Sequence, residues 1–371
     1  MTKVLVTGGA GFIGGHLVDA LVAHGDQVHV IDPLLPQVHP SPPDYLNPKA
    51  KYHKSDVAEA RVLSKLLPGA EVIFHLGAAV GTAQSMYQVD GYVRENSLGT
   101  AKLLQALIDR KLRPRRLVVA SSNTIYGEGR YRCAKCGPIA PGLRSEEQLL
   151  KHDWAVHCPI CGAPAQPAPT EEGKPLDPST VYAMTKYDEE KLSLMIGEAY
   201  GIPTVACRFF NTYGPRQQLH NPYTGLTAIF LNQIRNGHAP IVYEDGFQTR
   251  DFVNVHDIVR GLLLAMERRE AVGHAINLGT GKGTSVREVA RLLMDLEARE
   301  LPLNTPNKYR PGDVRHCTAD ISLARKLLGY EPKIDLRTGL AELHAWSRER
   351  RTEDKVRAAN QELVDRGILK G

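Results

Sequence analysis

The sequence has 371 residues, which is enough for about two domains of ordinary size. Its hydrophobic content of 42% and charged content of 23% are typical of a folded globular protein. The net charge of +5 is dispersed, with no run of five or more Lys or Arg, and no apolar stretch approaches the ~20 residues that cross a bilayer, so neither nucleic acid nor a membrane is an expected partner.

The first predicted elements are short apolar strands that alternate with helices. Glycines interrupt the first apolar run and no cleavage site follows it, so we interpret this run as a buried strand and not as a signal peptide. Continuous apolar strands joined by helices indicate an α/β fold with a Rossmann-type, doubly wound parallel sheet. The strands are predicted at 3–8, 27–32, 71–77, 115–122 and 203–211, and the helices at 12–24, 98–110 and 182–200.

Beyond residue 212 the predicted elements become shorter and more mixed. We interpret this part as a smaller C-terminal α/β lobe packed against the first sheet. The residues from 346 to 371 are highly charged and form a predicted helical tail. In the smaller lobe, strands are predicted at 239–245, 250–255 and 274–279, and helices at 257–267 and 286–297.

The turn after the first strand has the glycine spacing of a dinucleotide-binding loop. Gly8, Gly11 and Gly14 permit a tight turn and let the backbone approach a pyrophosphate at the helix N-terminus. Asp32 ends the second strand, where a carboxylate can accept hydrogen bonds from the adenosine ribose and repels a 2′-phosphate. NAD is therefore expected in preference to NADP, with Asp56 as a further candidate at the adenine; the alternative is that Asp32 only starts the turn at Pro33.

Eight segments of the sequence resemble the extended short-chain dehydrogenases/reductases, specifically the NAD-dependent nucleotide-sugar epimerase/dehydratase group. They occur in the order of that family and cover most of residues 3–330. The segments are TGGAGFIG, HLGAA, ENSLGT, ASSNTIYG, YAMTK, RFFNTYGPRQ, FQTRDFVNVHDIV and YRPGDV. The resemblance implies an NAD-dependent enzyme, a nucleotide-sugar substrate and a homodimer. It also implies cofactor contacts at Phe12, Ile13, Val57, Leu76, Ala78, Ala79 and Asn96.

The catalytic signature of this family is Tyr-x-x-x-Lys, which occurs four times in the chain. Tyr45/Lys49 and Tyr131/Lys135 lie in irregular segments, and Tyr187/Lys191 lacks the expected lead-in. Tyr182 and Lys186 open a predicted helix and lie on one face of it. The ammonium of Lys186 and a cationic nicotinamide would both favour the Tyr182 phenolate as a base. Both residues are thus predicted to touch cofactor as well as substrate, and the resemblance makes Ser122 the third catalytic residue.

The residues after Ser122 point to a subclass. Sugar 4,6-dehydratases of this family carry Asp-Glu there, whereas this chain has Asn123 and Thr124, which cannot supply the extra acid and base. We therefore expect a 4-epimerase that works through a 4-keto sugar. The alternatives are a UDP-hexose 4-epimerase, a net oxidoreductase or decarboxylase, and a non-catalytic binding module that keeps the fold. The resemblance further implies substrate contacts near the sugar at Ser85, Ser122, Asn123, Thr124 and Tyr182, and at the diphosphate at Asn211, Arg250 and Arg310, where bidentate Arg suits the anion.

Two Cys-x-x-Cys pairs lie between Ser122 and Tyr182, where 59 residues replace the few dozen usual in the family. The pairs are separated by 21 residues and each is followed by Gly, which is close to the spacing of a four-thiolate structural zinc site. Such a site has no open position for catalysis. The zinc ligands are predicted to be Cys133, Cys136, Cys158 and Cys161, with disulfides or free thiols as the alternative and His152 or His157 as less favoured ligands.

A nucleic-acid finger is not expected, because residues 128–172 hold five Lys/Arg against six Asp/Glu. We expect instead a zinc-bearing flap at the rim of the sugar pocket or at a subunit contact, in a protein of the reducing cytoplasm. The insertion is similar to those of bacterial deoxysugar 4-epimerases that interconvert dTDP-L-rhamnose and dTDP-6-deoxy-L-talose. The predicted domains are an NAD-binding Rossmann domain (1–127 and 173–211), the zinc insertion (128–172), mainly a substrate-binding lobe (212–345) and the tail (346–371).

Overall fold

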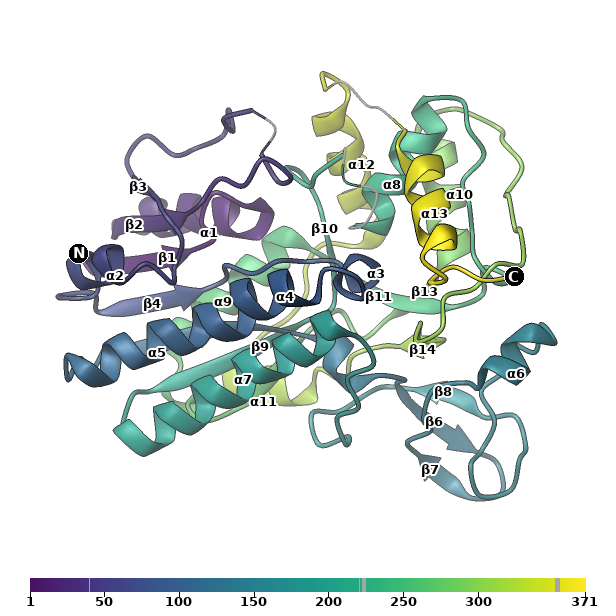
Figure 1. Cartoon of the computed structure of the whole chain (residues 1–371), viewed down its shortest axis with the longest axis horizontal. Helices are drawn as coiled ribbons and strands as arrows, with labels where there is room; N and C mark the ends of the chain where they lie inside the picture. The colour runs from purple at the N-terminus through teal and green to yellow at the C-terminus, as the bar shows by residue number, and fades with distance from the viewer. Residues whose placement is uncertain (40, 220, 222–224, 351–353) are drawn as a thin grey trace.

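A parallel sheet of seven strands forms the centre of the computed structural model, which describes residues 1–39, 41–219, 221, 225–350 and 354–371 (Figure 1). The strand order is β12-β9-β5-β4-β1-β2-β3, and every neighbouring pair is parallel. The order reverses between β1 and β4, as in doubly wound nucleotide-binding sheets. The predicted fold class is confirmed. The strands are β1 (Lys3–Thr7), β2 (Gln27–Asp32), β3 (Lys51–Lys54), β4 (Val72–His75), β5 (Arg116–Ser122), β9 (Thr204–Phe209) and β12 (Ala275–Leu278).

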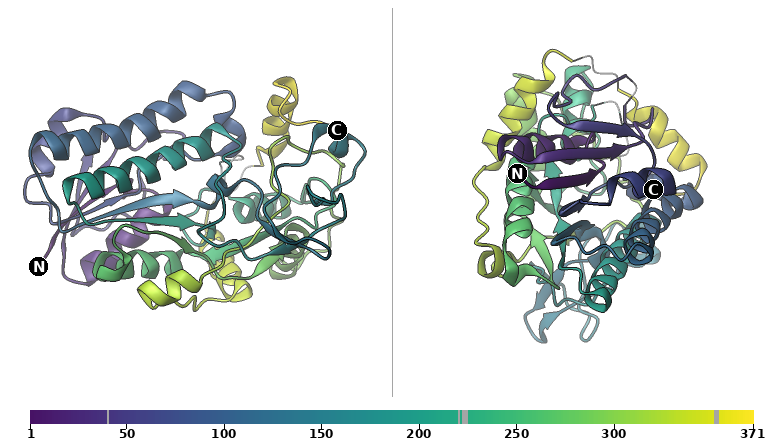
Figure 2. Two further views of the ribbon diagram at one scale, coloured as in Figure 1. Left: turned by 90° about the horizontal axis from the view of Figure 1, so that it is seen from below. Right: turned by 90° about the vertical axis from the view of Figure 1, so that its left-hand side faces the viewer.

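Helices cover both faces of this sheet (Figure 2). Successive residues of a strand point to opposite faces, so in β1 Val4 packs with the helices of one layer and Leu5 with those of the other. Because both faces are covered, the inner strands β1 and β4 are apolar and buried over nearly their whole length, whereas the edge strand β3 is polar and partly exposed. One layer holds α1 (Phe12–Ala23), α9 (Val255–Glu267) and α11 (Ser322–Leu328), and the other holds α2 (Ala60–Leu66), α5 (Gly99–Asp109) and α7 (Val181–Tyr200).

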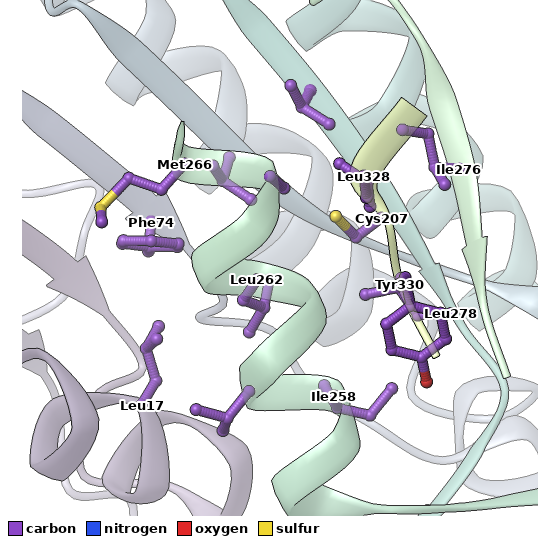
Figure 3. Close-up of a cluster of buried hydrophobic side chains, with 14 of the residues drawn as sticks. Leu17, Phe74, Cys207, Ile258, Leu262, Met266, Ile276, Leu278, Leu328 and Tyr330 are labelled. Atoms are coloured by element: carbon purple, nitrogen blue, oxygen red, sulfur yellow. The ribbon is translucent and has the colours of Figure 1, made fainter. Parts of the chain in front are cut away.

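Helix α9 lies at the centre of the larger hydrophobic cluster. Its residues Ile258, Leu262 and Met266 recur every four positions and therefore face one side, where Figure 3 shows them among Leu17 of α1 and Leu278 of β12. Each such buried side chain contributes roughly 2 kcal/mol of hydrophobic stabilisation. This packing fixes α9 against the main sheet, of which β12 is an edge strand.

The smaller lobe contains a four-stranded sheet in which β11 pairs with β10, β13 and β14. Two expectations for this region are wrong. Residues 239–245 form no strand, because Pro240 cannot donate a hydrogen bond and Glu244 adopts a left-handed φ of 53°; only an isolated bridge joins Ile241 to Asn304. The strand near 274–279 is β12, which joins the large sheet. The elements of the lobe are β10 (Asn211–Tyr213), β11 (Thr249–Asn254), β13 (Gly283–Ser285), β14 (His316–Cys317), α8 (Leu226–Arg235), α10 (Val286–Leu296) and α12 (Leu336–Ser347).

The inserted segment stands beside the smaller lobe as a separate antiparallel sheet (Figure 1). It consists of β6 (Arg130–Cys133), β7 (Gly137–Ile139), β8 (Gln166–Ala168) and the short helix α6 (Glu146–Leu150). The tail contains α13 (Val356–Asp365), and its Leu363 and Leu369 pack against Ala83 near the main sheet. No helix in the described parts of the chain is long and apolar enough to span a bilayer. The domain boundaries proposed above stay a prediction.

The remaining short elements connect the main sheet to its helices. They are α3 (Thr82–Ser85), α4 (Val89–Tyr92), the π-helix η1 (Val93–Leu98), and the 3₁₀-helices η2 (Asn123–Tyr126) and η3 (Arg269–Ala271). The π-helix continues directly into α5 and contains Asn96, so the irregular turn determines where this side chain points.

Candidate active site

The glycine loop lies at the carboxyl end of β1, next to the point where the strand order reverses. A Cβ atom on Gly14 would lie 2.1 Å from the carbonyl oxygen of Gly8, and one on Gly8 would lie 2.7 Å from Cα of Gly77. No side chain caps the start of α1, so the N–H groups of its first turn remain available to an anion. Phe12 and Ile13 belong to this turn. The loop therefore fits the pyrophosphate of a dinucleotide.

Asp32 is buried at the end of β2 and faces the glycine loop. Its carboxylate accepts hydrogen bonds from the backbone N–H of Ala10 at 3.0 Å and from that of Leu34 at 2.9 Å. Each carboxylate oxygen keeps a lone pair for a ribose hydroxyl. The carboxylate thus both organises the loop and starts the turn after β2, so the two interpretations of Asp32 are compatible.

The other predicted cofactor residues follow β3 and β4 or lie in η1. Asp56 accepts the N–H of Ala58 at 2.7 Å, and Val57 is buried against α5. Leu76, Ala78 and Ala79 follow β4. Asn96 is fully buried and bonds both backbone groups of Ala79, at 2.7 and 3.0 Å, and the Thr185 hydroxyl at 2.9 Å. Asn96 therefore holds the loop after β4 against α7.

His75 at the end of β4 is a core residue. Its ring nitrogens contact the hydroxyl groups of Thr7 at 2.7 Å and Thr100 at 2.9 Å. Burial lowers the pKa of His75 to about 3, so the ring is neutral near pH 7.

The structure brings Ser122, Tyr182 and Lys186 together at the carboxyl end of β5. Ser122 ends the strand, and its hydroxyl oxygen accepts the Thr124 hydroxyl at 2.9 Å and the Thr124 N–H at 3.2 Å. Tyr182 lies in the first turn of α7, which Thr180 caps by accepting the N–H of Ala183. Burial raises the pKa of Tyr182, while the Lys186 ammonium and a hydrogen bond with Ser122 oppose that rise.

A buried carboxylate that the sequence analysis missed pairs with Lys186. The ammonium donates to Glu189 Oε2 at 2.6 Å, and the side chains are only 4% and 1% exposed. Burial raises the pKa of Glu189, and the charge of Lys186 counteracts this. The i,i+3 spacing of Lys186 and Glu189 on a helix could have signalled the pair. Glu189 also affects the predicted base, Tyr182, because the negative charge of Glu189 raises the pKa of Tyr182.

The three alternative Tyr-Lys pairs lie in other settings. The Tyr45 hydroxyl donates to the Ala10 carbonyl at 2.9 Å, and burial raises its pKa to about 12. Tyr131 donates to the buried Glu128 at 2.8 Å. Lys191 lies over the Tyr187 ring, 5.8 Å from its centre. Tyr182, by contrast, has its hydrogen bond with Ser122.

The predicted sugar contacts lie on both sides of this group. Ser85 is buried in α3, and its hydroxyl donates to the Thr82 carbonyl at 2.7 Å. Thr124 bonds Ser122, as described above, and the Asn123 amide reaches the Cys317 thiol. The structure therefore uses Asn123 to connect β5 with β14 of the smaller lobe.

The predicted diphosphate contacts come from three elements. Asn211 of β10 has a buried side-chain oxygen that finds no hydrogen-bond partner among the described residues. Arg310 pairs with Asp313 at 2.8 Å and lies 5.2 Å from the centre of the Tyr243 ring. Arg250 donates to the carbonyls of Val314 at 2.7 Å and Arg315 at 3.1 Å. Both guanidinium groups are thus held by the segment 309–317.

The four cysteines of the insertion converge, with their sulfur atoms within 4.8 Å of one another. The thiols are free, and the Cys133 and Cys161 sulfurs are 3.5 Å apart. Backbone N–H groups of Cys136 and Lys135 lower the pKa of Cys133 to about 7. Gly137 and Gly162, which follow the two pairs, adopt positive φ values of 78° and 72° that close each turn. This set suits a tetrahedral metal with thiolate ligands.

The two histidines of the insertion, His152 and His157, do not belong to this cluster. His157 contacts Asp153 at 2.7 Å and the Gly162 carbonyl at 3.1 Å, and His152 stacks on Trp154. The cluster found among the described residues contains the four cysteines alone.

A parallel nucleotide-binding sheet with a Ser-Tyr-Lys group at its carboxyl edge defines an α/β protein of the dinucleotide-binding class. The profile of the NAD dependent epimerase/dehydratase family matches residues 4–144, and that of GDP-mannose 4,6 dehydratase matches residues 162–343. The chain is 33% identical over 349 residues to the dTDP-L-rhamnose 4-epimerase of Burkholderia thailandensis, covering 93% of this chain and 94% of that protein.

Solved structures agree with these matches. The UDP-glucose 4-epimerase of Thermotoga maritima with UDP-glucose has a TM-score of 0.76 at 28% identity. The UDP-glucuronic acid 4-epimerase of Bacillus cereus, in complex with UDP-glucuronic acid and NAD, has a TM-score of 0.74 at 27% identity. Each comparison covers 94% of this chain and 99% of the other. The chain therefore belongs to the NAD-dependent epimerase/dehydratase family, as an enzyme of the NAD-dependent nucleotide-sugar epimerase type.

Proposed function

We propose that the protein inverts C4 of a nucleotide-activated sugar, with dTDP-L-rhamnose and dTDP-6-deoxy-L-talose as the pair that it interconverts. The main support for this reaction type is that Ser122, Tyr182 and Lys186 lie together beside the glycine loop. In addition, Asn123 and Thr124 stand where a dehydratase would have an acid and a base. The identity to the Burkholderia enzyme supports the sugar.

The proposed roles follow from the chemistry of each side chain. Tyr182 takes the proton of the C4 hydroxyl, Ser122 bonds the same oxygen, and the charge of Lys186 favours the phenolate. Gly8, Gly11, Phe12, Ile13 and Gly14 would hold the pyrophosphate of NAD, with the ribose at Asp32. NAD, when bound, would supply reversible hydride chemistry at C4. After the 4-keto sugar turns over in the pocket and is reduced on its other face, Tyr182 would return the proton to the C4 oxygen. Asn211, Arg250 and Arg310 would bind the diphosphate.

Two alternatives are open, one with a different substrate and one with a different reaction type. A UDP-hexose 4-epimerase is favoured by the likeness to the Thermotoga enzyme, whose structure contains UDP-glucose. A net oxidoreductase or decarboxylase would use the same Ser-Tyr-Lys group but would keep the hydride on the cofactor. The fate of the hydride therefore separates the reaction types.

The test is to incubate the purified protein with dTDP-L-rhamnose, UDP-glucose and UDP-glucuronic acid in parallel. We expect the C4 epimer of dTDP-L-rhamnose, detected by NMR of the sugar ring, and no stoichiometric rise in absorbance at the wavelength of NADH. Faster turnover of UDP-glucose would overturn the sugar assignment. Stoichiometric NADH would overturn the reaction type.

We further propose that the four cysteines bind one structural zinc ion. The converging sulfur atoms and the two left-handed glycines support this. With four thiolates the coordination shell is closed, so the metal would stabilise the insertion and take no part in the reaction. Metal analysis of protein purified without chelator should give one zinc per chain, and a metal-free, fully active preparation would contradict it. Free thiols also fit the reducing cytoplasm that we expect.

A homodimer is the third proposal. Apolar side chains that are between 43% and 59% exposed lie along η1, α4 and α7, on one outer face of the sheet: Val89, Val93, Leu98, Met184 and Met195. An exposed apolar surface of this kind is typical of a subunit interface. Sedimentation should give twice the mass of 40.9 kDa, and Met195→Glu should give the single mass.

A further inference from the structure

A buried group of charges joins the insertion to the smaller lobe. Arg144 donates to both carboxylate oxygens of Glu244, at 3.0 and 2.9 Å, and to the Asp313 carbonyl at 3.1 Å. Arg315 donates to the same Glu244 at 2.7 Å and to Asp245 at 2.7 and 2.8 Å. The Arg144 side chain is 2% exposed and that of Glu244 is 5% exposed. Two guanidinium groups and two carboxylates leave this group electrically neutral.

Two more contacts tie the insertion to the segment 309–317. Glu128, at the base of the insertion, is fully buried and accepts the backbone N–H groups of Arg315 and His316 at 2.7 and 2.8 Å. Trp154 packs on Tyr309, with the ring centres 6.2 Å apart. The insertion therefore contacts this segment at its start, its middle and its end.

The segment that the insertion holds carries both cations proposed for the diphosphate. Arg310 follows Tyr309, and its guanidinium bonds Asp313, whose carbonyl accepts Arg144. Arg250 is oriented by the carbonyls of Val314 and Arg315. Glu244 lies close enough that its charge raises the pKa of Arg310. The position of each cation thus depends on the backbone of a segment that Arg144 helps to hold.

We propose that Arg144 is a positioning residue through which the insertion sets the affinity for the nucleotide sugar. The proposal rests on the proposed function, because it takes Arg250 and Arg310 as the diphosphate contacts. Loss of Arg144 would leave two carboxylates against one guanidinium, a net negative charge buried beside the site of an anionic substrate. It would also release the carbonyl of Asp313. Both effects weaken substrate binding, while Ser122, Tyr182 and Lys186 stay as they are.

The test compares Arg144→Met with Arg132→Met, the same change at an exposed position of β6 in the same insertion. For Arg144→Met we expect KM for the nucleotide sugar to rise about tenfold, the change that one truncated contact of this kind gives, with kcat within about twofold. The Kd for NAD and the zinc content should not change. Arg132→Met should match the unaltered protein in every measurement.

Arg310→Met separates a failure of this inference from a failure of the proposed function. If Arg310→Met raises KM and a folded Arg144→Met does not, the positioning role is wrong and the substrate site stands. If neither variant changes KM, the diphosphate site itself is wrong. A fall in kcat with KM unchanged in Arg144→Met would also overturn the inference.

A second variant covers the case in which Arg144→Met does not fold. Arg144→Lys keeps the charge but cannot make the paired bonds to Glu244, so we expect a smaller rise in KM, about threefold. Docking of the insertion can be followed directly in a Trp346→Phe background, where Trp154 is the single tryptophan of the chain. Its emission should shift to longer wavelength in Arg144→Lys as Trp154 loosens from Tyr309; unchanged emission and unchanged KM would refute the proposal.

Discussion

The parallel sheet and the inserted segment are stabilised in different ways. The sheet is buried between two helical layers and shares two large hydrophobic clusters with them. The insertion has strands of three or four residues and a cluster of six buried residues, two of which are cysteines. A cluster of this size has too few apolar residues to stabilise a sheet by itself. Such a segment needs a bound metal or a neighbouring surface to pack against. The insertion has candidates for both, namely the four-cysteine cluster and the contacts that Glu128, Arg144 and Trp154 make with the smaller lobe.

Tyr182→Phe is expected to have the largest effect of these changes. It should slow the reaction at the edge of the main sheet and leave the insertion as it is. Losing the phenol removes the base, so kcat should fall by about 10³-fold, within the range for general acid–base groups. Binding of NAD, the zinc content and the melting temperature should stay the same. Turnover of the nucleotide sugar measures the loss, and Tyr187→Phe is the matched control. Normal activity of Tyr182→Phe would show that another Tyr-Lys pair is the functional one.

Cys158→Ser should act on the fold of the insertion and not on that of the main sheet. If zinc binding supplies the folding free energy of this segment, its loss should unfold residues near 133–168 and leave the main sheet intact. Limited proteolysis followed by mass spectrometry should give new cuts within the insertion, and NAD binding should persist. Cys207→Ala is the control, because burial in the core raises the pKa of that thiol to about 12 and it binds no metal. Cuts spread over the whole chain would show instead that the two regions unfold together.

Glu189→Gln is expected to have the smallest effect, which is a shift along the pH axis. The charge of Glu189 raises the pKa of Tyr182, so removing that charge lowers it and makes the phenolate available at lower pH. The acidic limb of the kcat profile should therefore move to lower pH. Asp188→Asn changes a partly exposed neighbour that bonds Ser97 at 2.7 Å and should leave the profile in place. A shift upward would mean that Glu189 acts by orienting Lys186 and not through its charge.

Much of the fold and of the candidate site could be predicted because the signals are local. Apolar runs predicted β1, β2, β4, β5 and β9, and the glycine loop placed the pyrophosphate site between one strand and the next helix. Among the four Tyr-x-x-x-Lys sequences, the strand and turn that precede Tyr182 distinguish it from the other three. The strand predicted at 239–245 failed because Pro240 and the left-handed Glu244 interrupt an otherwise apolar run. Likewise, no local signal tells which sheet β12 joins.

The sequence by itself determined the strands and helices of the main sheet, the glycine loop, the Tyr-x-x-x-Lys motif and each Cys-x-x-Cys pair, because each depends on residues close together along the chain. The tertiary structure alone decided how the insertion meets the rest of the molecule. Arg144 and Glu244 are 100 positions apart, and Glu128 and Arg315 are 187 apart. A buried charge needs a partner, but the sequence does not say which one, because only the packing of distant elements brings the two together.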